Sequence, residues 1–112
     1  MLFRSVEKTY WAVCYGLSQS RSFTERSPLS LIDKKTGNVR AVRSGGRSAV
    51  THFEVLVENR DLGLSLIACH PETGRSHQIR VHLELQGLPI VGDKRYGASR
   101  RRPLPEIGRA HV

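Results

Sequence analysis

The stretch PETGRSHQIRVH, residues 71–82, decides the fold because the spacing of apolar residues changes inside it. Before this stretch the apolar residues alternate with polar ones, which is the spacing of β-strands. From residue 76 to residue 86, Ile79 and Leu83 recur one helical turn apart, and no Gly or Pro interrupts the segment. Gly87 then stands where a helix normally ends. We therefore expect a helix over residues 76–86 that follows a sheet.

The same alternation, interrupted by turn residues, predicts the sheet. We expect strands over residues 7–16, 49–58 and 62–70, and a hairpin whose arms are residues 28–33 and 39–43. Residues 17–27 are polar and rich in Ser and Arg, so we expect a loop there. Residues 88–93 are expected to leave the helix as an extended segment. The predicted fold class is α+β, with a mixed, mostly antiparallel sheet and one main helix.

Alternation also predicts which side chains form the core. On the strand predicted over residues 49–58, the apolar face carries Thr51, Phe53, Val55 and Val57. On the next strand the corresponding face carries Leu62, Leu64, Leu66 and Ala68. The two cysteines, Cys14 and Cys69, lie inside apolar runs and form no C-x-x-C pair. We therefore expect two buried thiols and neither a zinc site nor a redox motif.

The charge balance favours a polyanionic partner. Eighteen Lys and Arg residues against ten Asp and Glu residues give a formal net charge of +8. Nucleic acid is the first candidate, an anionic membrane surface is the second, and a basic solvated face without a partner is the alternative. The sequence has no apolar run long enough to span a bilayer and no export signal, so we expect a cytoplasmic protein without a membrane partner.

The densest polar cluster lies at the junction between the last strand and the helix. Thr73 or Ser76 is expected to cap the start of the helix. Unpaired backbone N–H groups and the positive end of the helix dipole attract an anion at such a junction. Arg75, His77 and Arg80 add cations to it. A solvated helix end without a ligand is the alternative.

Several chemistries find no support in the residues. His77 and His82 lie five positions apart, on different faces of a helix, and no Cys or acidic neighbour completes a metal site. The sequence contains neither a G-x-S-x-G motif nor a Gly-rich phosphate loop. The residues by themselves therefore predict a basic protein of strands and one helix that binds an anionic polymer without a metal. They leave its reaction open.

Three segments carry a family pattern. The longest is P-x-TGRSHQIRVH at residues 71–82, followed by G-x-PI-x-GD-x-x-YG at residues 87–97. The others are FR-x-x-EK-x-Y-x-A-x-x-x-G at residues 3–16 and G-x-x-A-x-T-x-F-x-VL at residues 46–56. Together they resemble the RluA-type RNA pseudouridine synthases. The resemblance implies an incomplete pseudouridine synthase catalytic fold that isomerises uridine to pseudouridine in RNA, ribosomal RNA in particular, with no metal and no organic cofactor.

The resemblance also implies roles for particular residues. Tyr10 matches the tyrosine that contacts the target base, which the enzyme flips out of its stack. Arg75 matches the arginine that pairs with the catalytic aspartate and keeps it ionised. Ile79 matches the apolar residue packed beneath the active-site aromatic ring. Contacts to the RNA backbone are expected from Lys8, His77, Gln78 and Arg80.

One part of the family pattern is missing. The family's nucleophile is an aspartate in an Arg-Leu-Asp-x-x-Thr-Ser-Gly motif, which this sequence lacks. We therefore expect residues 1–98 to be a partial catalytic domain and residues 99–112 a basic, irregular tail. The codons of residues 106–112 can spell a common sequencing adapter, which predicts an artefact there. Three hypotheses stay open: an enzyme fragment that is inactive by itself, a non-catalytic RNA-binding module, and a small basic protein of a ribonucleoprotein.

Overall fold

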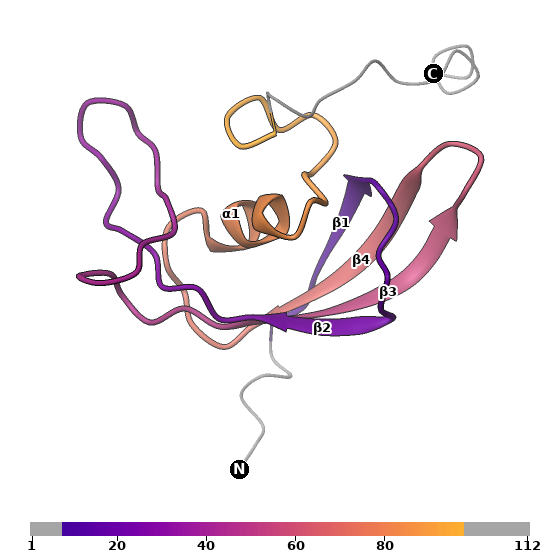
Figure 1. Cartoon of the computed structure of the whole chain (residues 1–112), viewed down its shortest axis with the longest axis horizontal. Helices are drawn as coiled ribbons and strands as arrows, with labels where there is room; N and C mark the ends of the chain where they lie inside the picture. Colours follow the sequence, from indigo (N-terminus) through magenta and orange to yellow (C-terminus); the bar gives the residue numbers. More distant parts are fainter. Residues whose placement is uncertain (1–7, 98–112) are drawn as a thin grey trace.

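The computed structural model describes residues 8–97, which form a four-stranded antiparallel sheet and one helix (Figure 1). The order across the sheet is β1-β4-β3-β2. The elements are β1 (Tyr10–Tyr15), β2 (Ser22–Glu25), β3 (Thr51–Asn59), β4 (Leu64–Pro71) and α1 (Gln78–Leu85). The α+β prediction with one main helix is confirmed. The first seven residues and the predicted tail, residues 99–112, lie outside the described residues, so the predicted domain limits stay predictions.

Helix α1 lies across one face of the sheet, and the core forms between them (Figure 1). Leu83 of α1 packs against buried residues of three strands, among them Phe53 and Ile67. Both cysteines are fully buried in the same cluster, as predicted, and burial raises the pKa of each thiol to about 12. Within residues 8–97, no helix has the length and apolar character that crossing a bilayer requires.

Strand β2 falls inside the segment that was expected to be a loop, so that prediction is wrong. Ser22–Glu25 pairs antiparallel with β3. Phe23 lies opposite Phe53, and the two rings stack with their centroids 5.1 Å apart. The strand is four residues long and carries a single large apolar side chain, so its sequence contains too little alternation to be recognised. Its pairing with β3 and the contact between the two rings stabilise it.

A β-bulge in β3 changes which side chains are buried. Val55 pairs with Ile67, and the next pair joins Val57 to Leu66, so Leu56 is the extra residue. The extra residue moves Val57 to the other side of the sheet, where 58% of it is exposed, whereas Val55 is 5% exposed. The predicted core face therefore holds for Thr51, Phe53 and Val55 and is wrong for Val57.

The buried face of β4 is also the opposite of the predicted one. Ser65, Ile67 and Cys69 are buried, while Leu64 and Leu66 are only half-buried. Pairing explains the difference, because Ile67 and Cys69 lie opposite Val55 and Phe53, whose side chains face α1. Ala68 is buried as predicted, although it belongs to the other face. Hydrophobicity could not decide between two faces that are both apolar.

Two connecting segments complete the structure. Residues 28–47 form the predicted hairpin: the Ser30 N–H donates to the Arg40 carbonyl at 2.9 Å, and Leu29 bridges to both Ala41 and Arg47. Leu29 packs with Val81 of α1 in a second buried cluster. After the helix, residues 88–90 are extended and run antiparallel beside β1, with Cys14 bridged to Ile90. Residues 91 and 92 lie in a turn, so the prediction of an extended segment over residues 88–93 is wrong for its second half.

The bulge predicts unequal effects for two identical substitutions. Val55→Ala removes buried methyl groups and should lower the free energy of unfolding by about 2 kcal/mol. Val57→Ala, two residues away on the exposed face, should change it by less than about 0.5 kcal/mol. Urea unfolding followed by far-UV circular dichroism measures both. Equal effects would show that β3 alternates without a bulge.

Candidate functional site

Helix α1 begins without the capping side chain that was expected. His77 is the N-cap residue, its φ of 55° lies in the left-handed region, and no side chain caps the helix. Both Thr73 and Ser76 are therefore wrong as predicted caps. The Thr73 hydroxyl instead accepts a hydrogen bond from the Val50 N–H at 3.2 Å and donates one to Gln78 Oε1 at 2.7 Å. The backbone turns sharply into the helix at a position that favours glycine, which costs conformational energy at this junction.

The Gln78 side chain is buried at this junction and uses its whole amide group. Its Nε2 donates to the Val50 carbonyl at 3.0 Å and to Thr51 Oγ1 at 2.8 Å. Its Oε1 accepts from Thr73 Oγ1 and from the Arg75 backbone N–H, the latter at 3.0 Å. A carbonyl can only accept and a backbone N–H can only donate, so these two partners determine the orientation of the amide.

The hydrogen bonds continue from Gln78 to His82 on the next turn of α1. The Thr51 hydroxyl lies 2.8 Å from His82 Nδ1, and His82 Nε2 lies 2.9 Å from the Ser27 carbonyl oxygen. Because that carbonyl only accepts, Nε2 carries the proton and Nδ1 accepts from Thr51. Burial lowers the pKa of His82, which favours this neutral form. We call the chain Thr73–Gln78–Thr51–His82 the buried relay.

The buried relay holds Arg75. Gln78 fixes its backbone N–H, and the Arg75 Nε donates to the Ser48 carbonyl at 2.6 Å. The side chain is half-buried. Within residues 8–97 its terminal Nη groups have no hydrogen-bond partner, so they can meet a ligand or a carboxylate. A guanidinium whose Nε is already held presents two parallel donors in a defined direction, which suits a carboxylate or a phosphate.

The other predicted catalytic residues lie on two elements. Ile79 follows Gln78 in α1 and packs against the core cluster that contains Ala12 of β1. Tyr10, the first residue of β1, lies opposite Cys69 and is 49% exposed. Arg75 precedes α1 and Ile79 is the second residue of that helix, so both lie at the junction of β4 with α1. Among residues 8–97 the structure shows no hydrogen bond between Tyr10 and Arg75, so the predicted roles of the three residues stay predictions.

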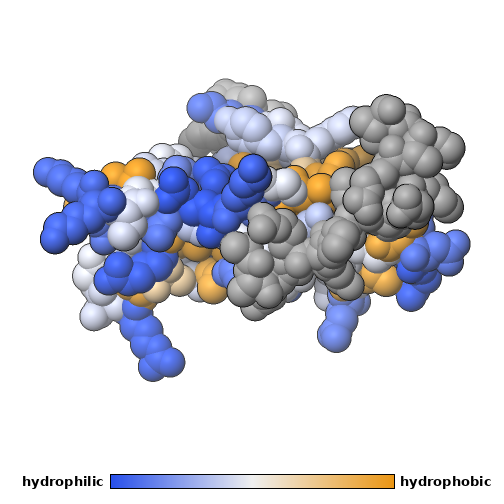
Figure 2. All heavy atoms as spheres, turned by 90° about the horizontal axis from the view of Figure 1, so that it is seen from above, coloured by the Kyte–Doolittle hydropathy of each residue, from blue (hydrophilic) through white to orange (hydrophobic). Residues whose placement is uncertain are grey.

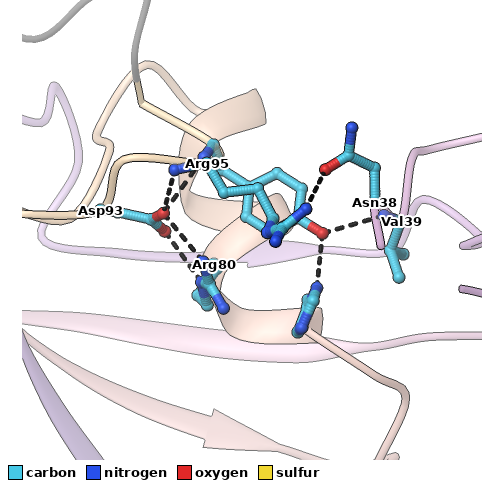
Figure 3. A network of polar contacts seen from close by, with 7 residues as sticks. Asn38, Val39, Arg80, Asp93 and Arg95 are labelled. Atoms are coloured by element: carbon cyan, nitrogen blue, oxygen red, sulfur yellow. Dashed lines mark hydrogen bonds and ion pairs between the residues drawn. The ribbon is translucent and has the colours of Figure 1, made fainter. Parts of the chain in front are cut away.

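Arg80, predicted to contact RNA, is engaged within the protein (Figure 3). Its Nε and Nη2 donate to the two Asp93 carboxylate oxygens at 2.9 and 3.0 Å, and its guanidinium lies 4.9 Å from the centre of the Tyr96 ring. The hydrogen bonds from Arg80 lower the pKa of Asp93, with help from the backbone N–H groups of Tyr96 and Arg95. Asp93 is therefore a structural partner for Arg80.

His77 belongs to the same network through its contact with Tyr96. The Tyr96 hydroxyl accepts from the Val39 N–H at 2.9 Å and lies within hydrogen-bond distance, 2.5 Å, of His77 Nδ1. Arg95 donates to the Thr36 carbonyl and to Asn38 Oδ1 at 2.8 and 2.7 Å. Sequence reasoning assigned no role to Tyr96 or Arg95. Tyr96 belongs to the family pattern over residues 87–97, whereas Arg95 occupies a variable position in it. The network joins the hairpin to α1.

The remaining predicted RNA contacts differ in accessibility. Lys8 is exposed just before β1, where it can reach a ligand, whereas Gln78 is only 4% exposed and its amide is fully used. Within the described part of the chain, no group of three or more His, Cys, Asp or Glu side chains could hold a metal ion. The predicted absence of metal and of cofactor stays a prediction.

Solved structures with the same arrangement define the class of fold. The human RNA pseudouridylate synthase domain containing 1 protein superposes with a TM-score of 0.71 at 27% identity, over 87% of this chain and 45% of that one. The human domain containing 4 protein gives a TM-score of 0.67 at 29% identity, over 88% of this chain and 40% of that one. The sheet and the helix that lies across it therefore form a pseudouridylate synthase fold.

The sequence comparison identifies the family. Residues 2–85 match the RNA pseudouridylate synthase family, and the chain belongs to it, as the resemblance predicted. Bacillus subtilis YhcT, an uncharacterized RNA pseudouridine synthase, is 42% identical over 84% of this chain and 31% of its own length. Ribosomal large subunit pseudouridine synthase C of Rickettsia conorii is 38% identical over 96% of this chain and 35% of its own length. The chain thus spans about a third of the length of these relatives.

The buried relay predicts a large cost for breaking it at Thr51. Thr51→Val keeps the shape of the side chain but leaves one of the two N–H groups of Gln78 Nε2, and also His82 Nδ1, without a partner, so it should lower the free energy of unfolding by about 1–3 kcal/mol. Thr24→Val is the matched control, because Thr24 makes the same type of bond to His52 Nδ1, at 2.9 Å, on the exposed surface. Its cost should stay below about 0.5 kcal/mol. Urea unfolding compares the two, and equal losses would contradict the relay.

The lowered pKa of His82 predicts a loss of stability in acid. The imidazole of His82 binds a proton less readily in the folded state than in the unfolded chain, where the pKa of a His side chain is about 6.5. Stability should therefore be complete above about pH 6.5 and fall below it, by at most about 1.4 kcal/mol per pH unit for this group. Urea unfolding at several pH values measures the slope, and an NMR titration of His82 locates its midpoint. A midpoint at or above the ordinary value would contradict this prediction.

Proposed function

We propose that this chain forms the arginine side of the active site of an RNA pseudouridine synthase. The observation that carries the proposal is the fixed direction of Arg75, which Gln78 and the Ser48 carbonyl hold at the junction between β4 and α1. In this reading Arg75 pairs with the catalytic carboxylate and keeps it ionised. Ile79 supports the site from the core, and Tyr10 meets the flipped uridine.

We propose further that the carboxylate comes from a segment outside these 112 residues. The sequence has three aspartates, Asp33, Asp61 and Asp93. Asp93 is engaged with Arg80, Asp33 accepts hydrogen bonds from the Lys35 and Thr36 backbone N–H groups, and Asp61 lies in the turn between β3 and β4. A nucleophile needs a free oxygen beside its arginine, and none of these three residues supplies one within residues 8–97.

Ribosomal RNA is the proposed substrate. The name of the Rickettsia relative assigns that protein to the large ribosomal subunit, and the net charge of +8 suits a polyanion. The second candidate function is RNA binding without catalysis, which the lack of an Arg-Leu-Asp motif favours.

A chimera tests the proposal. Residues 8–97 replace the matching segment of the Rickettsia enzyme, and the substrate is large-subunit RNA labelled with tritium at carbon 5 of uridine, where the new glycosidic bond displaces the label. The chimera should release tritium. Arg75→Gln should reduce the release by at least about 100-fold. Arg60→Gln, in the exposed β3–β4 turn, is the control and should leave it unchanged.

The chain by itself should bind RNA and release no tritium. Turnover by the chain would show that it contains its own nucleophile. An active chimera in which Arg75→Gln has no effect would remove Arg75 from the site. An inactive chimera that still binds RNA would favour the non-catalytic module.

A further inference from the structure

We propose that His82 is a positioning residue for Arg75 and that it acts through the buried relay. The inference rests on the function proposed above, because it gives the far end of the relay a part in the same reaction. His82 lies on the second turn of α1, whereas Arg75 precedes that helix. Thr51 of β3 and Gln78, the first residue of α1, connect the two by hydrogen bonds.

The hydrogen bonds of the relay are compatible with one protonation state of His82. The Ser27 carbonyl can only accept, so His82 Nε2 carries a proton and Nδ1 accepts from the Thr51 hydroxyl. The oxygen of that hydroxyl accepts in turn from Gln78 Nε2, at 2.8 Å. The oxygen of the same amide then faces the Arg75 N–H. A neutral His82 therefore satisfies each bond between Ser27 and the Arg75 backbone.

A second proton on His82 would reverse the first of these bonds. The imidazolium can only donate, so the Thr51 hydroxyl would accept from it and would lose the acceptor for its own hydrogen. A half-turn of the Gln78 amide would supply an acceptor. It would also place Nε2 against the Arg75 N–H and Oε1 against the Val50 carbonyl, two pairs of like groups. Protonation thus either leaves a buried donor unpaired or turns the amide that holds Arg75.

Water cannot supply the missing partner inside the core. Thr51 and His82 are both 0% exposed, and Gln78 is 4% exposed. Figure 2 shows hydrophilic side chains gathered at the end of the molecule that carries the hairpin in Figure 1, where solvent can replace a lost hydrogen bond. A buried donor has no such replacement, so a change at one end of the relay is passed along it.

The groups around His82 keep it neutral near pH 7. Burial lowers the pKa of its imidazole, and the Ser27 carbonyl and the Glu25 carboxylate oppose this effect without cancelling it. Glu25, the last residue of β2, is the charged group that acts on His82 within residues 8–97, and hydrogen bonds from Ser27 and Gln86 hold its carboxylate. Thr51 supplies the uncharged contact from β3. Acid is therefore the condition that changes the state of the relay.

An NMR titration of the full chain tests the coupling without catalysis. The backbone amide signal of Arg75 should shift with the same midpoint as the His82 imidazole, because one proton changes both. In Thr51→Val, which cuts the relay at its centre, the Arg75 signal should no longer follow that midpoint. His52→Asn is the matched control and should leave the shared midpoint unchanged, because His52 Nδ1 makes the corresponding contact with the Thr24 hydroxyl, at 2.9 Å, on the exposed surface.

The pH profile of tritium release by the chimera tests the effect on the reaction. With KM little changed, kcat should be constant above about pH 6.5 and fall by up to about tenfold per pH unit below the lowered pKa of His82. His82→Leu offers Thr51 no acceptor and should lower kcat at neutral pH by about tenfold. His82→Asn offers a neutral acceptor that does not titrate, so it should restore part of that loss and abolish the fall in acid. Circular dichroism at each pH confirms that the chimera stays folded.

The outcomes separate this inference from the proposed function. An Arg75 signal that does not follow the titration of His82 overturns the inference, and an active chimera would then leave the proposed function standing. A fall in kcat that persists in His82→Asn belongs to another group and overturns it as well. An inactive chimera rejects the proposed function, whereas a shared midpoint in the chain would still support the coupling between His82 and Arg75.

Discussion

The amide of Gln78 is the constraint on which the rest of the site depends. Four hydrogen bonds connect it to the start of β3, to the segment after β4 and to the Arg75 backbone. The Val50 carbonyl can only accept and the Arg75 N–H can only donate, so these two partners fix its orientation. Through Thr51 and His82 the same chain reaches Ser27, before the hairpin. A fully satisfied polar chain in a core of this kind specifies one arrangement, because any shift leaves a buried donor or acceptor unpaired.

These hydrogen bonds explain the strained backbone of His77 at the start of α1. A left-handed His77 is unfavourable, yet it lets the segment turn so that Gln78 enters the core while His77 faces Tyr96. The Tyr96 hydroxyl then binds the hairpin at Val39. The Arg80–Asp93 pair attaches the segment that follows the helix to the helix itself. Gln78 therefore holds Arg75 on one side of the junction, and the contact of His77 with Tyr96 attaches the hairpin on the other.

The sequence predicted the change from sheet to helix and three of the four strands, because long alternating or helical patterns reflect burial directly. It did not reveal β2, whose four residues depend on Phe53 for their stability, nor the bulge at Leu56, which has no signature in an apolar run. Of the site, the family pattern indicated Arg75 and Ile79. The relay roles of Thr51 and His82 require knowing which distant polar groups meet in the core, and spacing along the chain contains no such information.

The two buried thiols can be used to measure how often the core opens. Cys14 and Cys69 are completely inaccessible, and a pKa of about 12 leaves almost no thiolate at neutral pH. Alkylating reagents therefore cannot attack them until β1 separates from β4 and the helix lifts away. The rate of their modification measures how often the core between sheet and helix opens, and any partner that clamps this face of the sheet would slow that rate.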